Sequence, residues 1–213
     1  MADLPDELTM DILSCNDDKY ELVGSCNGVA CLSTYDENDF TRSEIFLWNP
    51  WTGEWRRLPR PRFFVSEVIG FGFVSSQGSG SARLPRPGDF KVVNIRIESG
   101  LFMGRCSQVE VYSLRRSSWK RISNGFPCGI DHKCLGNQVV FRNFVCWSYQ
   151  YDASLVMFDL VEEAFHRMVL PLSMRLLTEQ ICPLGGCLCL IGYKPSCQSR
   201  EVWIMKEFGI AES

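Results

Sequence analysis

The chain has 213 residues, of which 46% are hydrophobic and 22% are charged, and its formal net charge is −3. This composition is that of a globular domain and excludes a largely disordered protein. The mildly acidic charge gives no general attraction to nucleic acid or anionic membranes. No apolar run reaches the ~18 residues of a membrane-spanning helix, and Asp3, Asp6 and Glu7 stand where a secretion signal would be basic. We therefore expect a cytoplasmic or nuclear protein with no membrane and no nucleic-acid partner.

The first predicted element is a short amphipathic helix within residues 1–15. Leu4, Leu8 and Ile12 recur at helical spacing. Asp3 followed by Pro5 is typical of a helix start. The helical pattern ends near residue 14, and from about residue 21 the chain reads as β-strand.

Three segments further along align without gaps: residues 45–55, 109–119 and 155–165. Each is an apolar strand that ends in an aromatic residue, passes through a polar turn and resumes with a second aromatic residue. We predict that these aromatic pairs are the structural anchors of a repeat: Trp48 and Trp55, Tyr112 and Trp119, Phe158 and Phe165. A fourth copy begins at residues 202–205.

Further strands are predicted between these copies. Asn27-Gly28 and Gly185-Gly186 are typical of tight hairpins. The strands are expected at residues 28–33, 70–76, 90–97, 138–141, 144–149 and 186–193. About four short strands in each period of about 46 residues is the pattern of a β-propeller blade. The sequence therefore predicts an all-β, propeller-type fold, with a β-sandwich as the alternative.

The chain offers few residues for catalysis or metal binding. Its two histidines are His132 and His166, and His166 is expected to face outward from a strand. Cys128, His132 and Cys134 are conceivable zinc ligands, but a structural site usually needs four ligands. Glu162 and Glu163 are expected to face solvent in a turn. The eleven cysteines are odd in number and several lie in apolar strand patterns, so we expect reduced thiols. We predict no enzyme activity, no metal and no cofactor.

Two groups of basic residues flank aromatic residues of the repeat. The groups are Arg56, Arg57, Arg60 and Arg62 near Trp55, and Arg115, Arg116, Lys120 and Arg121 around Trp119. Single-stranded nucleic acid can bind such groups, but their common position in the repeat favours a solvent-exposed face. The tandem LPRP segments, 58–61 and 84–87, could adopt polyproline II, although turns and blocked strand edges are commoner roles. From loop position alone, substrate contacts are predicted in residues 35–42, 75–88, 99–105, 125–133 and 194–200.

Several segments of the chain together resemble a known family. LPDELTMDILS, residues 4–14, resembles the first helix of an F-box. LVGSCNGVACL and IFLWNPWTGEWRRLP are similar to the opening of the F-box-associated domain of plant F-box proteins of the S-locus and kelch-like types. GFGFV, GDFKVVNI, VEVYSLRRSSWKRI, FDLVEEAFHRMVLP and WIMKEFG follow in that family's order.

The resemblance implies a non-catalytic substrate-recognition subunit of an SCF-type (Skp–cullin–F-box) E3 ubiquitin ligase, which recruits a protein for ubiquitination and degradation. It implies a truncated F-box remnant at residues 1–15 and a kelch-like propeller domain at 16–213, because two further F-box helices and the end of the domain are missing. The propeller is therefore expected to be incomplete. Contacts to the Skp-type adaptor would fall on Leu4, Pro5, Leu8, Ile12 and Leu13. The alternative is an interaction domain that no longer binds the adaptor and is inert or competes with an intact paralogue.

Overall fold

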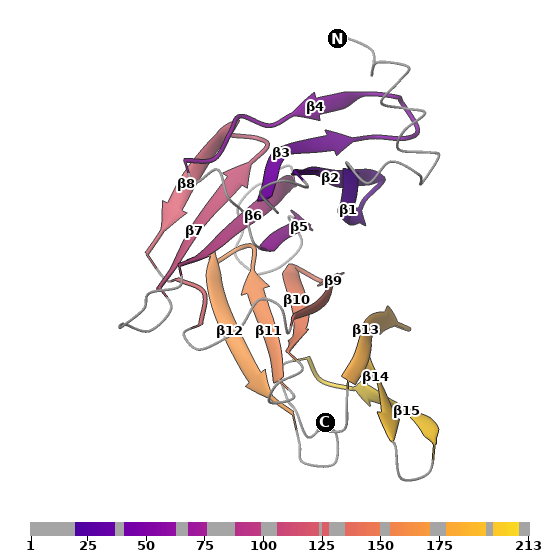
Figure 1. Cartoon of the computed structure of the whole chain (residues 1–213). Coiled ribbons are helices and arrows are strands. Elements are labelled where there is room, and N and C mark those ends of the chain that lie inside the picture. The colour runs from indigo at the N-terminus through magenta and orange to yellow at the C-terminus, as the bar shows by residue number, and fades with distance from the viewer. Residues whose placement is uncertain are drawn as a thin grey trace, which may run out of the picture.

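The computed structural model describes residues 20–36, 41–62, 68–75, 88–98, 106–123, 125–127, 135–149, 154–170, 178–194 and 198–208. These residues form strands and connecting turns (Figure 1). Within these ranges no helix has the length and apolar character needed to cross a membrane. The helix predicted within residues 1–15 lies outside the described residues.

The strands form four antiparallel sheets, which we name A to D in chain order. Sheet A contains β1 (Tyr20–Cys26), β2 (Val29–Asp36), β3 (Thr41–Trp48) and β4 (Trp55–Arg57). Sheet B contains β5 (Val68–Val74), β6 (Asp89–Glu98), β7 (Cys106–Ser113) and β8 (Ser118–Ile122). Sheet C contains β9 (Leu135–Phe141), β10 (Phe144–Tyr149), β11 (Ser154–Asp159) and β12 (Ala164–Val169). Sheet D contains β13 (Thr178–Leu184), β14 (Cys187–Lys194) and β15 (Ser199–Met205).

Each sheet is a simple meander in which every strand pairs with the next along the chain. Figure 1 shows β1, β5 and β9 on the inner side of the assembly and β4, β8 and β12 at its outer edge. Separate hydrophobic cores join sheet A to B, sheet B to C, and sheet C to D. Successive meanders packed face to face in chain order are blades of an incomplete β-propeller. The all-β, propeller-type prediction is confirmed.

Strand β5 shows how one blade contacts both of its neighbours. Successive side chains of a strand point to opposite faces. Phe71 is fully buried in the core between sheets A and B. Gly70 and Gly72 face sheet C, where an added Cβ would lie 2.8 Å from Trp147 Cζ2 and 2.6 Å from Leu160 Cδ1, respectively. The two glycines therefore leave room for side chains of sheet C.

The predicted repeat is present in sheets A, B and C as the third and fourth strands. Its aromatic pairs are direct cross-strand partners: Trp48 with Trp55, Tyr112 with Trp119, and Phe158 with Phe165. The apolar residue three positions after each second aromatic residue is buried in every case: Leu58, Ile122 and Met168. The fourth copy, at residues 202–205, lies in β15.

The three turns of the repeat share one backbone conformation. Gly53, Ser117 and Glu163 hold the same turn position and have φ of 70°, 53° and 56°. Glycine tolerates this left-handed region, whereas serine and glutamate rarely adopt it. A polar side chain at the start of each turn accepts a backbone N–H: Asn49 from Trp51, Ser113 from Arg116, and Asp159 from Val161 and Glu162. These Asx- and Ser-type turns explain why a polar residue follows each first aromatic residue.

The predicted hairpins also occur. Asn27-Gly28 and Gly185-Gly186 have positive φ at both positions, as a type I′ turn requires. A third two-residue hairpin, at 142–143, joins β9 and β10, and Arg142 has φ of 55° there. It lies between the strands expected at 138–141 and 144–149. Sequence reasoning missed strand β13, because Pro183 interrupts its apolar pattern.

Candidate functional site

The meander places two kinds of connection at one end of the blades. In each four-stranded sheet, the connection from the first to the second strand and the connection from the third to the fourth strand lie at the same end. We call this the turn end. In sheets A, B and C it contains turns 49–54, 113–118 and 159–164 and hairpins 27–28 and 142–143. Ser75 N donates to Asn143 Oδ1 at 3.2 Å, linking sheets B and C there. Leu160 N donates to Asn143 O at 2.9 Å, joining the two turns of sheet C.

The turn 159–164 locks sheet C against sheet B. Leu160 has no exposed surface and lies in the core between the two sheets, over Gly72. Lys91 of β6 donates from Nζ to Leu160 O at 2.5 Å and to Glu163 Oε1 at 2.8 Å. Lys120 of β8 donates to Glu163 Oε2 at 2.7 Å. One carboxylate therefore binds two lysines from two strands of the neighbouring blade.

We call Glu163 with Lys91 and Lys120 the clamp. The two lysines of the clamp set the ionisation of Glu163. Burial alone would raise the pKa of its carboxyl, but hydrogen bonds and charge from Lys120 and Lys91 outweigh burial and lower the pKa. The Lys91 side chain is only 12% exposed, so an ionised partner is needed to compensate its charge. The expectation that Glu163 faces solvent is therefore incomplete: Glu162 is exposed, whereas Glu163 is half-buried.

A groove of about 220 Å³ lies beside the clamp. Its walls include the cations Lys91, Arg115, Arg116 and Lys120 and the carboxylates Asp89 and Glu163. Asp89 is held by two donors, Ser113 Oγ at 2.5 Å and Arg115 N at 2.9 Å. The cations outnumber the carboxylates, so the groove has a positive balance of charge.

Sheet A adds basic residues to the same end. Arg56 of β4 donates from Nη2 to Ser117 Oγ at 3.0 Å, across the boundary to sheet B. Arg57 and Arg60 both bind Glu44, which neutralises part of this group. The two basic groups found in the sequence therefore meet at one blade boundary.

The segment that leaves β4 crosses from sheet A to sheet B. Trp119 Nε1 donates to Pro59 O at 2.6 Å, and Arg62 N donates to the buried Glu110 Oε2 at 3.0 Å. Leu58 and Pro61 are buried. The first LPRP segment, 58–61, therefore packs across the boundary between sheets A and B. The second, at 84–87, lies outside the described residues.

The turn end also exposes apolar side chains. Trp51, in the turn of sheet A, is 89% exposed. Val161, in the turn of sheet C, is 56% exposed. Exposed tryptophans are enriched among the anchor residues of protein interfaces.

A second cavity, of about 430 Å³, lies where the inner strands meet. Its lining comes from β1, β5 and β9 together with Trp147. Gln138 of β9 accepts a hydrogen bond from Phe71 N at 2.9 Å, and Gly24 lacks the Cβ that would collide with its amide. Gln138 thus contacts both β1 and β5, and its buried Nε2 has no hydrogen-bond partner among the described residues.

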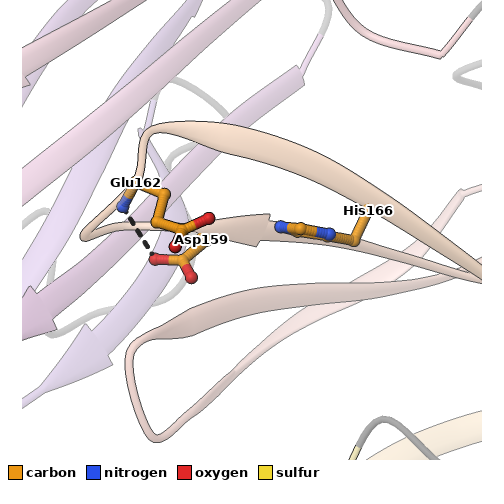
Figure 2. A group of neighbouring side chains, drawn as sticks. All are labelled: Asp159, Glu162 and His166. Carbon is orange, nitrogen blue, oxygen red and sulfur yellow. Dashed lines mark hydrogen bonds between the residues drawn. The ribbon is translucent and has the colours of Figure 1, made fainter. Parts of the chain in front are cut away.

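Asp159, Glu162 and His166 bring one ligand atom each to within 4.8 Å of one another (Figure 2). His166 is exposed on β12, as the sequence predicts. Asp159 Oδ1 already accepts hydrogen bonds from Val161 N and Glu162 N, at 2.6 and 3.0 Å. Turn formation therefore explains the position of this carboxylate without a metal ion.

The cysteines whose side chains the structure describes carry thiols. They are Cys26, Cys31, Cys146, Cys182, Cys187 and Cys189, in agreement with the predicted reduced state. Burial raises the pKa of Cys26 and of Cys146 to about 12. Both are therefore protonated at neutral pH and are poor nucleophiles.

The other predicted site residues have different outcomes. The proposed adaptor contacts within 1–15, and Cys128, His132 and Cys134, lie outside the described residues. Of the five predicted substrate loops, four join strands at the end opposite the turn end: 35–42, 99–105, 125–133 and 194–200. Only 75–88 joins strands at the turn end. The anchor role of the aromatic pairs stays a prediction: truncating the fully buried Tyr112 or Phe158 is expected to cost about 3–5 kcal/mol.

Comparison with known proteins identifies the family. The F-box associated beta propeller domain matches residues 3–212. The chain belongs to this family. The match confirms the resemblance to F-box-associated domains, and it includes most of the segment 1–15, whose assignment to an F-box remnant stays a prediction.

Relatives of this domain occur in Arabidopsis thaliana. An F-box/kelch-repeat protein is 25% identical over 210 residues, covering 90% of this chain and 50% of that protein. An F-box protein is 27% identical over 218 residues, covering 92% and 49%. The F-box protein CPR1 is 28% identical over 229 residues, covering 91% and 50%. The chain thus spans about half the length of these relatives.

Proposed function

We propose that this chain is the substrate-recognition part of an SCF-type E3 ubiquitin ligase and recruits a protein for ubiquitination without catalysing a reaction itself. The family match over residues 3–212 is the observation that carries the proposal. In this role the domain raises the concentration of a bound protein near the ubiquitin-transferring enzyme. Its partners would be a Skp-type adaptor and a protein substrate, in the cytoplasm or nucleus.

The turn end supports a role in protein binding. It combines an exposed tryptophan with arginines and a groove, all on turns fixed by packed sheets. Rigid sheets that carry variable turns are a common basis for recognition. The raised pKa values of Cys26 and Cys146 disfavour these thiols as catalytic nucleophiles, and Asp159 is held by hydrogen bonds within its turn.

A second candidate is a domain that binds the substrate but not the adaptor, and so competes with a complete F-box protein. The family match favours it to this extent: it identifies the F-box associated domain and does not itself identify an adaptor-binding part. The two candidates differ only in adaptor binding.

Adaptor binding is tested by a pull-down with a purified Skp-type adaptor. The wild-type chain is compared with Leu8→Asp/Ile12→Asp, with Leu22→Asp as the control, because Leu22 is 61% exposed on β1. A version with a complete F-box placed before residue 16 serves as the positive sample. We expect the chain and the control to bind and the double variant to lose binding. Binding by the complete version alone would overturn the ligase-subunit proposal for this chain and leave the competitor.

A further inference from the structure

We propose that the turn end of sheets A and B binds an acidic, Asp/Glu-rich segment of a partner protein through Arg56, Arg115 and Arg116. This inference rests on the proposed function, because it names the chemistry of the substrate that such a subunit would hold. The three arginines come from β4 and from the turn 113–118, and they meet where Arg56 bonds Ser117.

Two glutamates at this end pair with four of its cations, and these three arginines lie outside both pairings. Glu44 pairs with Arg57 and Arg60, and Glu163 pairs with Lys91 and Lys120. Among the described residues, the guanidinium groups of Arg56, Arg115 and Arg116 form no ion pair with a carboxylate. Asp89 has its two oxygens occupied by Ser113 and by the backbone of Arg115.

The arrangement suits carboxylates presented by a peptide. A guanidinium group offers a planar fork of donors that matches a carboxylate. The groove of about 220 Å³ beside Arg115 and Arg116 admits a side chain, and Trp51 supplies an exposed apolar surface at the same end of sheet A.

The two tryptophans that flank the basic groups in the sequence, Trp55 and Trp119, do not favour a nucleic-acid ligand. Trp119 packs against Tyr112 with ring centroids 5.2 Å apart, and its Nε1 is bonded to Pro59 O. Trp55 packs against Phe46 with ring centroids 5.9 Å apart. Neither ring is available as a platform for a stacked base.

The test is fluorescence anisotropy with the purified full chain and a short fluorescein-labelled peptide of alternating Glu and Gly. We expect saturable binding that weakens as salt is added, and no binding of the same peptide with Gln in place of Glu. Arg115→Glu should weaken binding at least about tenfold, because charge reversal removes an attraction and adds a repulsion. Arg116→Gln should weaken it by a smaller factor.

Lys206→Glu is the matched control, since Lys206 is exposed after β15 and its reversal changes the net charge equally. It should change binding by less than about twofold. Equal weakening by Arg115→Glu and Lys206→Glu would overturn the proposal, as would absence of peptide binding. Tighter binding of a single-stranded RNA of equal charge would also overturn it. The adaptor takes no part here, so failure leaves the adaptor pull-down result standing.

Discussion

The joints between sheets B and C and between sheets C and D are built differently. At the first joint, Leu160 fills space left by Gly72, and Glu163 binds Lys91 and Lys120 across the boundary. At the second, Phe208 follows β15 and packs on Phe141 and Phe144, with ring centroids 5.1 and 5.0 Å apart.

This difference shows what each joint contributes to the site. The joint between B and C adds partly buried polar groups, which need one geometry, to an apolar core, so it fixes the turn 159–164 against the groove. The aromatic joint is less directional, because it relies on apolar area and ring contacts. We therefore regard sheets B and C as the rigid unit that holds the turn end.

The largest expected effect on stability comes from truncating the buried leucine at the joint between sheets B and C. Leu160→Ala should lower the free energy of unfolding by about 2–5 kcal/mol, because Leu160 is fully buried and leaves a cavity. Urea denaturation measures this loss. Val161→Ala in the same turn is the control, since Val161 is 56% exposed and should cost less than about 0.5 kcal/mol. Equal losses would show that Leu160 is not a joint residue.

Removing the charge of the clamp should have the next largest effect. Glu163→Gln should cost about 1–3 kcal/mol at pH 7, because it leaves the partly buried Lys91 charge without an ionised partner. The exposed Glu162→Gln is the matched control. Its loss should be near zero in the same denaturation experiment.

The clamp also predicts a pH dependence. Because the native pKa of Glu163 is lowered, its stabilisation is complete above the ordinary value of 4.5 and is lost as pH falls through the native pKa. The stability difference between wild type and Glu163→Gln should therefore shrink as the pH falls below 4.5. A difference that stays constant from pH 7 to pH 3 would contradict the ionised clamp.

A smaller effect is expected at the C–D joint. Phe208→Ala should cost about 1–2 kcal/mol, because Phe208 is half-buried and loses two ring contacts. Phe208→Leu, which keeps an apolar side chain, should recover part of the loss. A cost larger than that of Leu160→Ala would reverse the order of the two joints.

The smallest effect on stability is expected at Trp51. Trp51→Ala should change the free energy of unfolding by less than about 0.5 kcal/mol, because the side chain is 89% exposed. It should nevertheless weaken binding of the acidic peptide severalfold in the anisotropy assay. Unchanged binding would remove Trp51 from the proposed surface.

Sequence reasoning predicted what lies within a sheet better than what lies between sheets. The pairing of Tyr112 with Trp119 follows from alternation and a turn of fixed length, which are local properties. The clamp at Glu163 depends on Lys91, which is distant in the chain, and nothing local marks that pair. Gly72 likewise gave no signal of its role, because the leucine that it accommodates belongs to another blade.

The candidate site was predicted only in part for the same reason. Both basic groups were visible in the sequence, but their meeting through Arg56 and Ser117 follows from blade packing. Loop length pointed mainly to the opposite end of the strands, because tight turns carry no length signal. The exposure of Trp51 depends on how its turn projects from sheet A.

Residue-resolved hydrogen exchange of the wild-type chain tests most directly whether sheets B and C form one rigid unit. The amides of β6, β7, β10 and β11 should exchange with a single opening free energy, higher than that of β14, and Leu160→Ala should lower it in both sheets together. Independent exchange of sheets B and C, or protection of β14 equal to theirs, would contradict the account.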